Sequence, residues 1–180
     1  ADLSREGINE DTFTYLNHVI VKNGSAKFKM ETGKGIPKEI AVDDELAELL
    51  GYFCAEGNVA RSKNRPTSFN SVFSYGKHEK HLIDRTAFLL EKIFSLKPTI
   101  RQRRTTITVE TSGSSIGVFF AALCGNKAKH KKVPAQIALS GENVIKSFVK
   151  GYLAGDGCVM KNNISFNTVS KKMAMGLYQL

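Results

Sequence analysis

Two short segments of the sequence share one pattern and end in an acidic residue followed by glycine. Residues 49–57 and 149–157 are both apolar, with Gly-Tyr in the middle and a small residue before the acid. The acids are Glu56 in the first segment and Asp156 in the second. Because the acid stands at the same point in each copy, the repeat predicts a pseudo-symmetric site built from two carboxylates.

The position of these acids suggests that they bind a cation. Each apolar segment predicts a helix, and the glycine after it is a common helix end. An acid in the last turn opposes the helix dipole and costs a few tenths of a kcal/mol or more. A metal ion reverses that local charge preference. Glu56 and Asp156 are therefore predicted to hold a cation; the competing interpretation is two ordinary helices with glycine caps, which the repetition disfavours.

Small residues line one face of each predicted helix. Gly51 and Ala55 are four residues apart, as are Gly151 and Gly155, so each pair lies on a single helix face. Small residues at this spacing allow two helix backbones to approach closely. If the helices cross at Gly51 and Gly151, the two acids emerge side by side at the same end.

The repeat continues after the acids, where residues 68–72 match residues 165–169 with a connection three residues shorter in the second copy. This predicts two related lobes. In the first lobe, hydrophobic periodicity predicts an α-β-β-α-β-β-α order, an α+β class in which helices pack on one face of an antiparallel sheet. The expected elements after the first motif helix, which Asp43 or Asp44 caps, include a strand at 68–75, a helix at 78–94, strands at 99–104 and 106–111, and a helix at 114–124 capped by Ser114.

The chain is expected to divide into an N-terminal extension at 1–43, a first lobe at 44–140 and a second lobe at 141–180. Residues 12–22 within the extension are expected to form a strand or a short helix. The second lobe has only 24 residues after Asp156, so it is expected to be incomplete.

The two motifs resemble those of the LAGLIDADG homing endonucleases, in the single-chain form with two lobes. The matching residues are Gly51, Ala55, Glu56, Gly57, Gly151, Gly155, Asp156 and Gly157, whereas Cys54 and Lys150 depart from the family pattern. The resemblance covers residues 44–169. It implies antiparallel sheets that form a DNA-binding saddle, with the motif helices packed at the lobe interface.

The resemblance further implies a site-specific endonuclease that makes a double-strand break by metal-dependent phosphodiester hydrolysis. Glu56 and Asp156 would hold two or three Mg²⁺ ions, helped by the main-chain carbonyls at Ala55 and Gly155. Mg²⁺ suits this role because it needs few protein carboxylates and keeps waters and substrate oxygens as its other ligands.

Basic and polar residues are expected to contact the DNA. The family places a catalytic lysine before the helix that follows the sheet, which favours Lys131, with Lys129 and Lys132 as alternatives; a solvated basic loop that touches only phosphate is an equally open interpretation. The resemblance also favours the open sheet face, with Arg101 and Arg103 on one strand side, as a surface that enters the major groove. The other expected DNA contacts are Ser68, Asn70, Lys129, Lys132 and Asn167.

The composition agrees with a polyanionic partner. Lys and Arg total 26 against 17 Asp and Glu, a net charge of +9, and such an excess favours nucleic acid. The three cysteines form no CxxC pair, which indicates buried free thiols in a reducing, intracellular compartment. No apolar run reaches the roughly 18 residues of a membrane span. We therefore expect an intracellular protein that binds nucleic acid, and the resemblance implies one that is monomeric when full length and binds a long site in double-stranded DNA.

Two other interpretations remain open. The first is a cleavage-inactive relative with the same fold, an intron RNA maturase or a DNA-binding regulator; an acid in both motifs favours the enzyme. The second is the nuclease part of an intein, because the segment from Gly35-Ile36-Pro37 to Glu45 resembles such contexts. No splicing nucleophile stands at Ala1 and no His-Asn pair ends the chain, which favours an intron-encoded or excised nuclease.

Overall fold

A small antiparallel sheet precedes the first motif helix. The computed structural model describes residues 19–61, 64–65, 67–160 and 163–180. The sheet consists of β1 (Val19–Lys22), β2 (Ser25–Phe28) and β3 (Ile36–Pro37). Residues 19–22 of the expected strand or short helix therefore form a strand, whereas 12–18 lie outside the described residues. Within the described part of the chain, no helix has the length and apolar character needed to cross a membrane.

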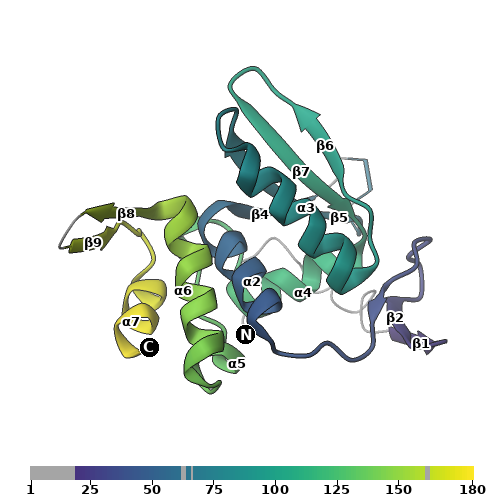
Figure 1. Cartoon of the computed structure of the whole chain (residues 1–180). Helices are drawn as coiled ribbons and strands as arrows, with labels where there is room; N and C mark the ends of the chain where they lie inside the picture. Colours follow the sequence, from purple (N-terminus) through teal and green to yellow (C-terminus); the bar gives the residue numbers. More distant parts are fainter. Residues whose placement is uncertain (1–18, 62–63, 66, 161–162) are drawn as a thin grey trace.

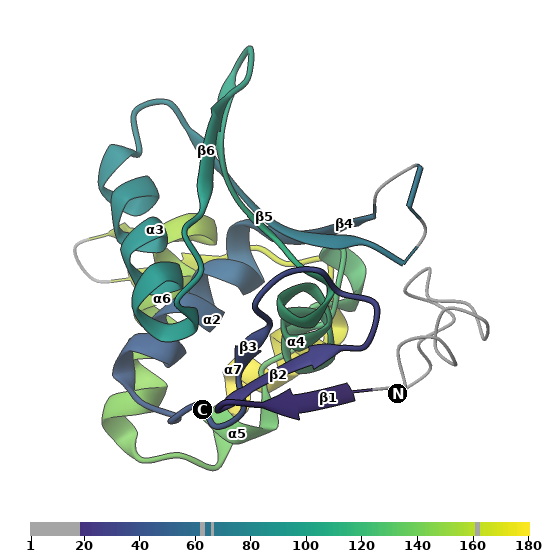
Figure 2. The same cartoon turned by 90° about the vertical axis from the view of Figure 1, so that its right-hand side faces the viewer.

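The first motif helix, α2 (Asp44–Glu56), leads into a four-stranded antiparallel sheet. Its strand order is β4 (Gly57–Arg61), β5 (Phe69–Gly76), β7 (Thr106–Ser112) and β6 (Thr99–Gln102). Helix α3 (Lys80–Phe94) connects β5 to β6, and α4 (Ser114–Cys124) follows β7. Figure 2 shows α2, α3 and α4 on the same side of this sheet. The predicted α-β-β-α-β-β-α order and α+β class are confirmed.

Aromatic side chains from four elements form the core beneath the sheet. Phe53 of α2 stacks on Phe120 of α4 with ring centroids 4.5 Å apart. Phe73 of β5 packs edge-on against both rings at 5.6 Å, and Phe94 of α3 contacts Phe120 at 5.8 Å. Alternation along β5 brings Phe73 and Tyr75 to this face, where both are buried. The core therefore fixes α2 against the sheet and sets the position of the helix end that carries the first acid.

The second motif helix follows a short connection. This connection contains η2 (Ala128–His130) and α5 (Ala135–Ala138), and it leads to α6 (Glu142–Asp156). Beyond α6, β8 (Gly157–Met160) and β9 (Asn163–Phe166) form an antiparallel pair, and α7 (Lys171–Gln179) comes last. Figure 1 shows β8, β9 and α7 on the opposite side of α6 from the first lobe. All three cysteines are free, as expected, but Cys158 is exposed because it lies on this peripheral strand pair.

The N-cap predicted for α2 is confirmed, whereas the one predicted for α4 is wrong. Asp43 caps α2, since its carboxylate accepts the Leu46 N–H at 2.8 Å. Ser114 does not cap α4, because the cap is Gly113 and the Ser114 hydroxyl donates to the Thr67 carbonyl at 2.6 Å. The carboxylate of Glu31, from the N-terminal segment, accepts the N–H of Ser115 instead.

The two hairpins differ in register. Gly57 pairs with Phe73 in the first lobe, whereas Gly157 pairs with Phe166 in the second. The strand pairing thus makes Phe166 the counterpart of Phe73, although the sequence match makes it the counterpart of Phe69. The physical reason is the length of the connection between the two strands. The last pair of the first hairpin is Arg61–Phe69, with residues 62–68 between them, whereas the last pair of the second is Met160–Asn163, with only residues 161–162 between them.

Candidate active site

Helices α2 and α6 cross with their main chains in contact. A Cβ atom on Gly51 would collide with the Phe148 carbonyl oxygen and lie 2.7 Å from the Tyr152 nitrogen. A Cβ atom on Gly151 would likewise collide with the Glu48 carbonyl oxygen. Both glycines of the motifs lie at the crossing, where any side chain would push the helices apart.

The crossing brings the C-terminal ends of α2 and α6 together. A Cβ atom on Gly155 would lie 2.7 Å from the Ala55 Cβ and 2.9 Å from the Glu56 Cγ. Glu56 and Asp156 line one cavity at this end, with a volume of about 600 Å³. The structure therefore places the two acids side by side, one from each motif helix.

The environment of both acids disfavours their charged forms. Burial, followed by the charges of Asp156 and Glu79, raises the pKa of Glu56 to about 7, and Lys131 only partly opposes this. Burial also raises the pKa of Asp156, again against the charge of Lys131. By accessible surface Glu56 is half-buried and Asp156 is exposed, and two carboxylates that lie side by side in this way are a favourable environment for a cation. Among the residues that the structure describes, no group of three or more His, Cys, Asp or Glu side chains is suited to a metal, so any ion here would have few carboxylate ligands.

Lys131 lines the same cavity, but its ammonium group is bound to the main chain. Its Nζ donates to the carbonyl oxygens of Phe53 and Gly57, the latter at 2.8 Å, and lies 3.7 Å from the centre of the Phe53 ring. A cation is favourable there because the negative end of the α2 dipole lies at these carbonyls. Burial lowers the pKa of Lys131. The lysine thus caps the helix end that carries Glu56.

Asn126 supports the site through its side chain, a role that sequence reasoning missed. It is buried; its Oδ1 accepts the Val59 N–H at 2.8 Å and its Nδ2 donates to the Val59 carbonyl at 3.1 Å, as a neighbouring strand would. The same Oδ1 accepts the N–H of Lys127 at 3.0 Å. The Gly125-Asn126 pair after a helix is a turn signal in the sequence, but its strand partner is not visible there. Asn126 thereby anchors the basic loop at residues 125–132, and the exposed Lys127 of this loop lines the cavity.

The expected DNA contacts occupy several different places. Arg101 and Arg103 lie together on the open face of the sheet, where both form ion pairs with Glu110. Asn167 lies in the cavity of the two acids, because it follows the end of β9. The others are dispersed: Asn70 is half-buried in β5 opposite Ser112, Ser68 lines a separate hollow with Glu31, Lys129 is exposed in η2, and Lys132 is half-buried after it.

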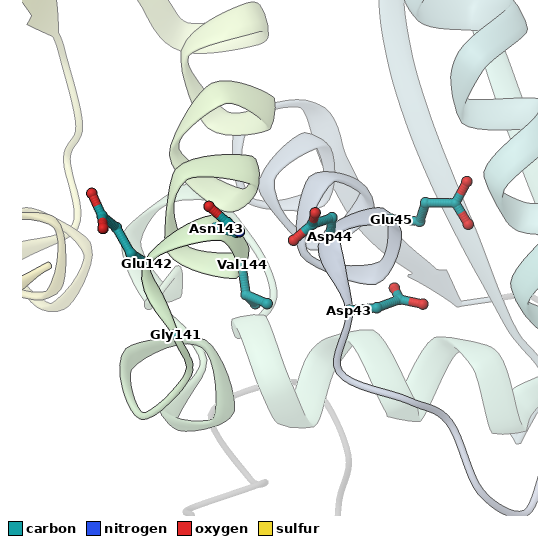
Figure 3. A pocket seen from close by; sticks show the side chains of 7 residues that line it. All are labelled: Asp43, Asp44, Glu45, Gly141, Glu142, Asn143 and Val144. Atoms are coloured by element: carbon teal, nitrogen blue, oxygen red, sulfur yellow. The ribbon is translucent and has the colours of Figure 1, made fainter.

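A second hollow, of about 670 Å³, lies at the opposite ends of the two motif helices. Its lining residues are Asp43, Asp44, Glu45, Gly141, Glu142, Asn143 and Val144. In Figure 3 the carboxylates of Glu45 and Glu142 point away from each other. Asp43 caps α2, and Glu45 pairs with Lys92 at 2.7 Å. A negatively charged hollow whose carboxylates diverge would repel a phosphodiester, whereas Lys127 and Lys131 line the cavity of Glu56 and Asp156, so that cavity is the candidate site.

Residues 43–125 and 143–180 match the family of LAGLIDADG-like domains, over more than half of the chain. The chain belongs to the LAGLIDADG-like domain family. This LAGLIDADG-like chain is 31% identical over 157 residues to a DNA polymerase of Thermococcus sp. (strain GE8), a match over 86% of the chain and 9% of that protein. It is 29% identical over 159 residues to an A-type ATP synthase subunit of Pyrococcus abyssi, over 86% of the chain and 15% of that protein. The chain thus spans a small part of the length of either relative.

The LAGLIDADG-like fold is also similar to a solved structure. The crystal structure of I-DmoI in complex with DNA and Ca matches 68% of this chain and 62% of that one, with a TM-score of 0.51 and 17% identity. At this identity the likeness concerns the fold. It supports the predicted α+β architecture of the LAGLIDADG homing endonucleases.

Proposed function

We propose that this chain is the nuclease part of a site-specific homing endonuclease that cuts both strands of double-stranded DNA. One observation carries the proposal: Glu56 and Asp156 lie in one cavity at the end of the α2–α6 crossing, one acid from each repeat. Two acids related by pseudo-symmetry provide one carboxylate for each strand of a duplex, whose own strands are related by a two-fold axis.

The donor set fits Mg²⁺. Glu56 and Asp156 would hold the ions, two or three in number, with help from main-chain carbonyls at Ala55 and Gly155, since the last carbonyls of a helix have no intrahelical donor. Bound divalent ions supply a more acidic water and stabilise the leaving oxygen of a phosphodiester. The raised pKa of Glu56, about 7, fits a carboxylate that ionises fully only when a cation is present.

The basic residues of the cavity have separate roles in this proposal. Lys131 lies beside both acids, where its charge opposes the rise in their pKa values, and it holds the end of α2 through the Phe53 and Gly57 carbonyls. Its assignment as the catalytic lysine stays a prediction. The exposed Lys127, held in place by Asn126, is the second candidate for contact with the scissile phosphate.

The DNA would lie on the open face of the sheet formed by β4 to β7. The net charge of +9 supplies the long-range attraction, and Arg101 and Arg103 supply guanidinium groups on that face. Lys129 and Lys132, in the loop beside the cavity, would contact phosphates near the cut. The proposed enzyme acts as a monomer, because both acids come from one chain.

The relatives favour an inserted element as the origin of the chain. Parts of a DNA polymerase and of an ATP synthase component, proteins with different activities, are both similar to it. A segment shared by such proteins is typical of a module inserted into each of them rather than of either activity. This supports the nuclease part of an intein over an intron-encoded enzyme.

Cleavage and binding by single-acid variants test the proposal. The substrate is a duplex that joins the two sequences flanking the coding region of the element. With Mg²⁺ the wild-type protein should give one defined double-strand cut, whereas Glu56→Gln and Asp156→Asn should bind the duplex and leave it intact. Glu142→Gln, which removes an exposed charge at the other end of α6, is the control and should cut normally.

Two outcomes would count against it. Cutting by either acid variant at near the wild-type rate would show that the paired carboxylates are not the site. If the wild-type protein binds the duplex but never cuts it, with Mg²⁺ or Mn²⁺, the cleavage-inactive alternative is correct.

A further inference from the structure

Glu110 of β7 binds both arginines of the open sheet face. Its Oε2 forms an ion pair with Arg101, 3.1 Å from Nε, and its Oε1 accepts a hydrogen bond from Arg103 Nη2 at 3.2 Å. The Thr108 hydroxyl donates to the same Oε1 at 2.7 Å. The Glu110 side chain is only 15% exposed, whereas each arginine side chain is 58% exposed. A mostly covered carboxylate therefore lies beneath two guanidinium groups that reach solvent.

Strand pairing explains why these side chains meet. Arg101 lies opposite Thr108 in the β6–β7 register, and the Arg103 N–H donates to the main chain of Thr106. Side chains alternate along a strand, so Thr108 and Glu110 share one face, while the intervening Val109 is buried in the core. The diagonal contact between neighbouring strands then brings Arg101 next to Glu110.

We propose that Glu110 is a specificity-determining positioning residue, which holds Arg101 and Arg103 so that their remaining N–H groups read guanine bases in the major groove. The proposal rests on the proposed function, since it assumes that DNA lies on this face. The Arg101 side chain is 58% exposed and contacts Glu110 through Nε, so its terminal Nη groups face solvent. Such a fork matches the O6 and N7 acceptors of guanine, the commonest specific contact of arginine with DNA.

The charge of Glu110 supports base reading over phosphate binding. Two guanidinium groups around one carboxylate carry a net charge of one, so this cluster attracts phosphates less than two free arginines would. Glu110 thus reduces sequence-independent affinity and fixes the direction of two donors that carry sequence information.

The test compares Glu110→Gln with Glu142→Gln, which removes the same charge from a pair with Lys146 on α6. Binding sequences are selected from a random-sequence duplex pool, and the salt dependence of affinity is measured on the unselected pool. Wild type and Glu142→Gln should both select guanine at two fixed positions. Glu110→Gln should lose that preference by about tenfold or more at each of them. It should bind the unselected pool more tightly, with a log–log salt slope steeper by about one unit.

Arg101→Lys is a second variant that tests the proposal even if Glu110→Gln does not fold properly. It keeps the charge but removes the fork, so guanine preference should fall at one position while the salt slope stays unchanged. If Glu110→Gln keeps its guanine preferences, or loses affinity equally for all sequences together with a lower melting temperature, Glu110 is only structural. Selected sites without guanine would overturn only the proposal that Glu110 positions the two arginines for guanine. If the wild-type protein selects no sequence from the pool, both the proposed function and the proposed role of Glu110 are overturned.

Discussion

Gly51→Ala is the smallest change that tests whether the helix crossing positions the site. The added Cβ would collide with the Phe148 carbonyl oxygen and lie 2.7 Å from the Tyr152 nitrogen, whereas ordinary van der Waals contact begins at 3.4 Å. Both neighbours are main-chain atoms, so no side-chain rotation can make room. Helix α6 must move away from α2 by several tenths of an ångström or more.

The expected loss of stability follows from two opposing effects. Alanine is favoured over glycine in a helix by about 1 kcal/mol. Overpacking costs about 1–3 kcal/mol, and a clash with main-chain atoms belongs at the upper end of that range. We therefore expect a net destabilisation of about 1–2 kcal/mol, which lowers the melting temperature of a chain of this size by roughly 2–8 °C.

Thermal melts monitored by circular dichroism measure this change. Gly33→Ala is the matched control, because a Cβ at Gly33 would meet no atom within 4 Å, and it should not lower the melting temperature. Cleavage measured well below both melting temperatures should fall for Gly51→Ala only, since separating the helices separates the two acids. A Gly51→Ala protein that melts at or above the wild-type temperature and cuts at the wild-type rate would refute the tight crossing.

Further predictions concern single buried groups. Thr111→Val should raise the melting temperature, because the Thr111 hydroxyl is buried and has no hydrogen-bond partner among the residues that the structure describes. Thr86→Val should lower the melting temperature, because it removes the 2.7 Å hydrogen bond to the Tyr75 hydroxyl, a loss of about 1 kcal/mol. If thermal melts of the two variants do not shift the melting temperature in opposite directions, the reasoning is wrong. In metal-free protein, the melting temperature should fall as the pH rises from 5 to 8, because the folded-state pKa of Glu56, about 7, exceeds the usual value of 4.5. Between these two values the folded state binds a proton that the unfolded chain has already released, so a rising pH favours unfolding. Glu56→Gln should flatten this pH dependence, and an unchanged profile in that variant would assign the titration to another group.

Sequence reasoning succeeded where the signal was local. Hydrophobic periodicity predicted the helices and strands of the first lobe, and the Asp43 cap needed only its neighbours on α2. The small-residue spacing also led to the expected close approach of α2 and α6. Such patterns are readable because each depends on residues within one or two helical turns.

Sequence reasoning failed where contacts join segments that are distant in the sequence. The carboxylate of Glu31 serves the start of α4 from 84 residues away, and nothing near Ser114 signals this. The catalytic role expected for Lys131 stays a prediction, but the sequence did not show that carbonyls of α2 and of the residue after it bind its ammonium group, because they become its neighbours only in the folded chain. The ion pairs of Glu110 likewise depend on the register of β6 and β7.

The location of bound Mn²⁺ tests the central claim most directly. Crystals of the protein grown with Mn²⁺ and duplex DNA would locate the ion by its anomalous scattering. The account predicts density within metal–ligand distance of carboxylate oxygens from both Glu56 and Asp156. Density in the acidic hollow of Asp44 and Glu142, or beside only one of the paired acids, would contradict it.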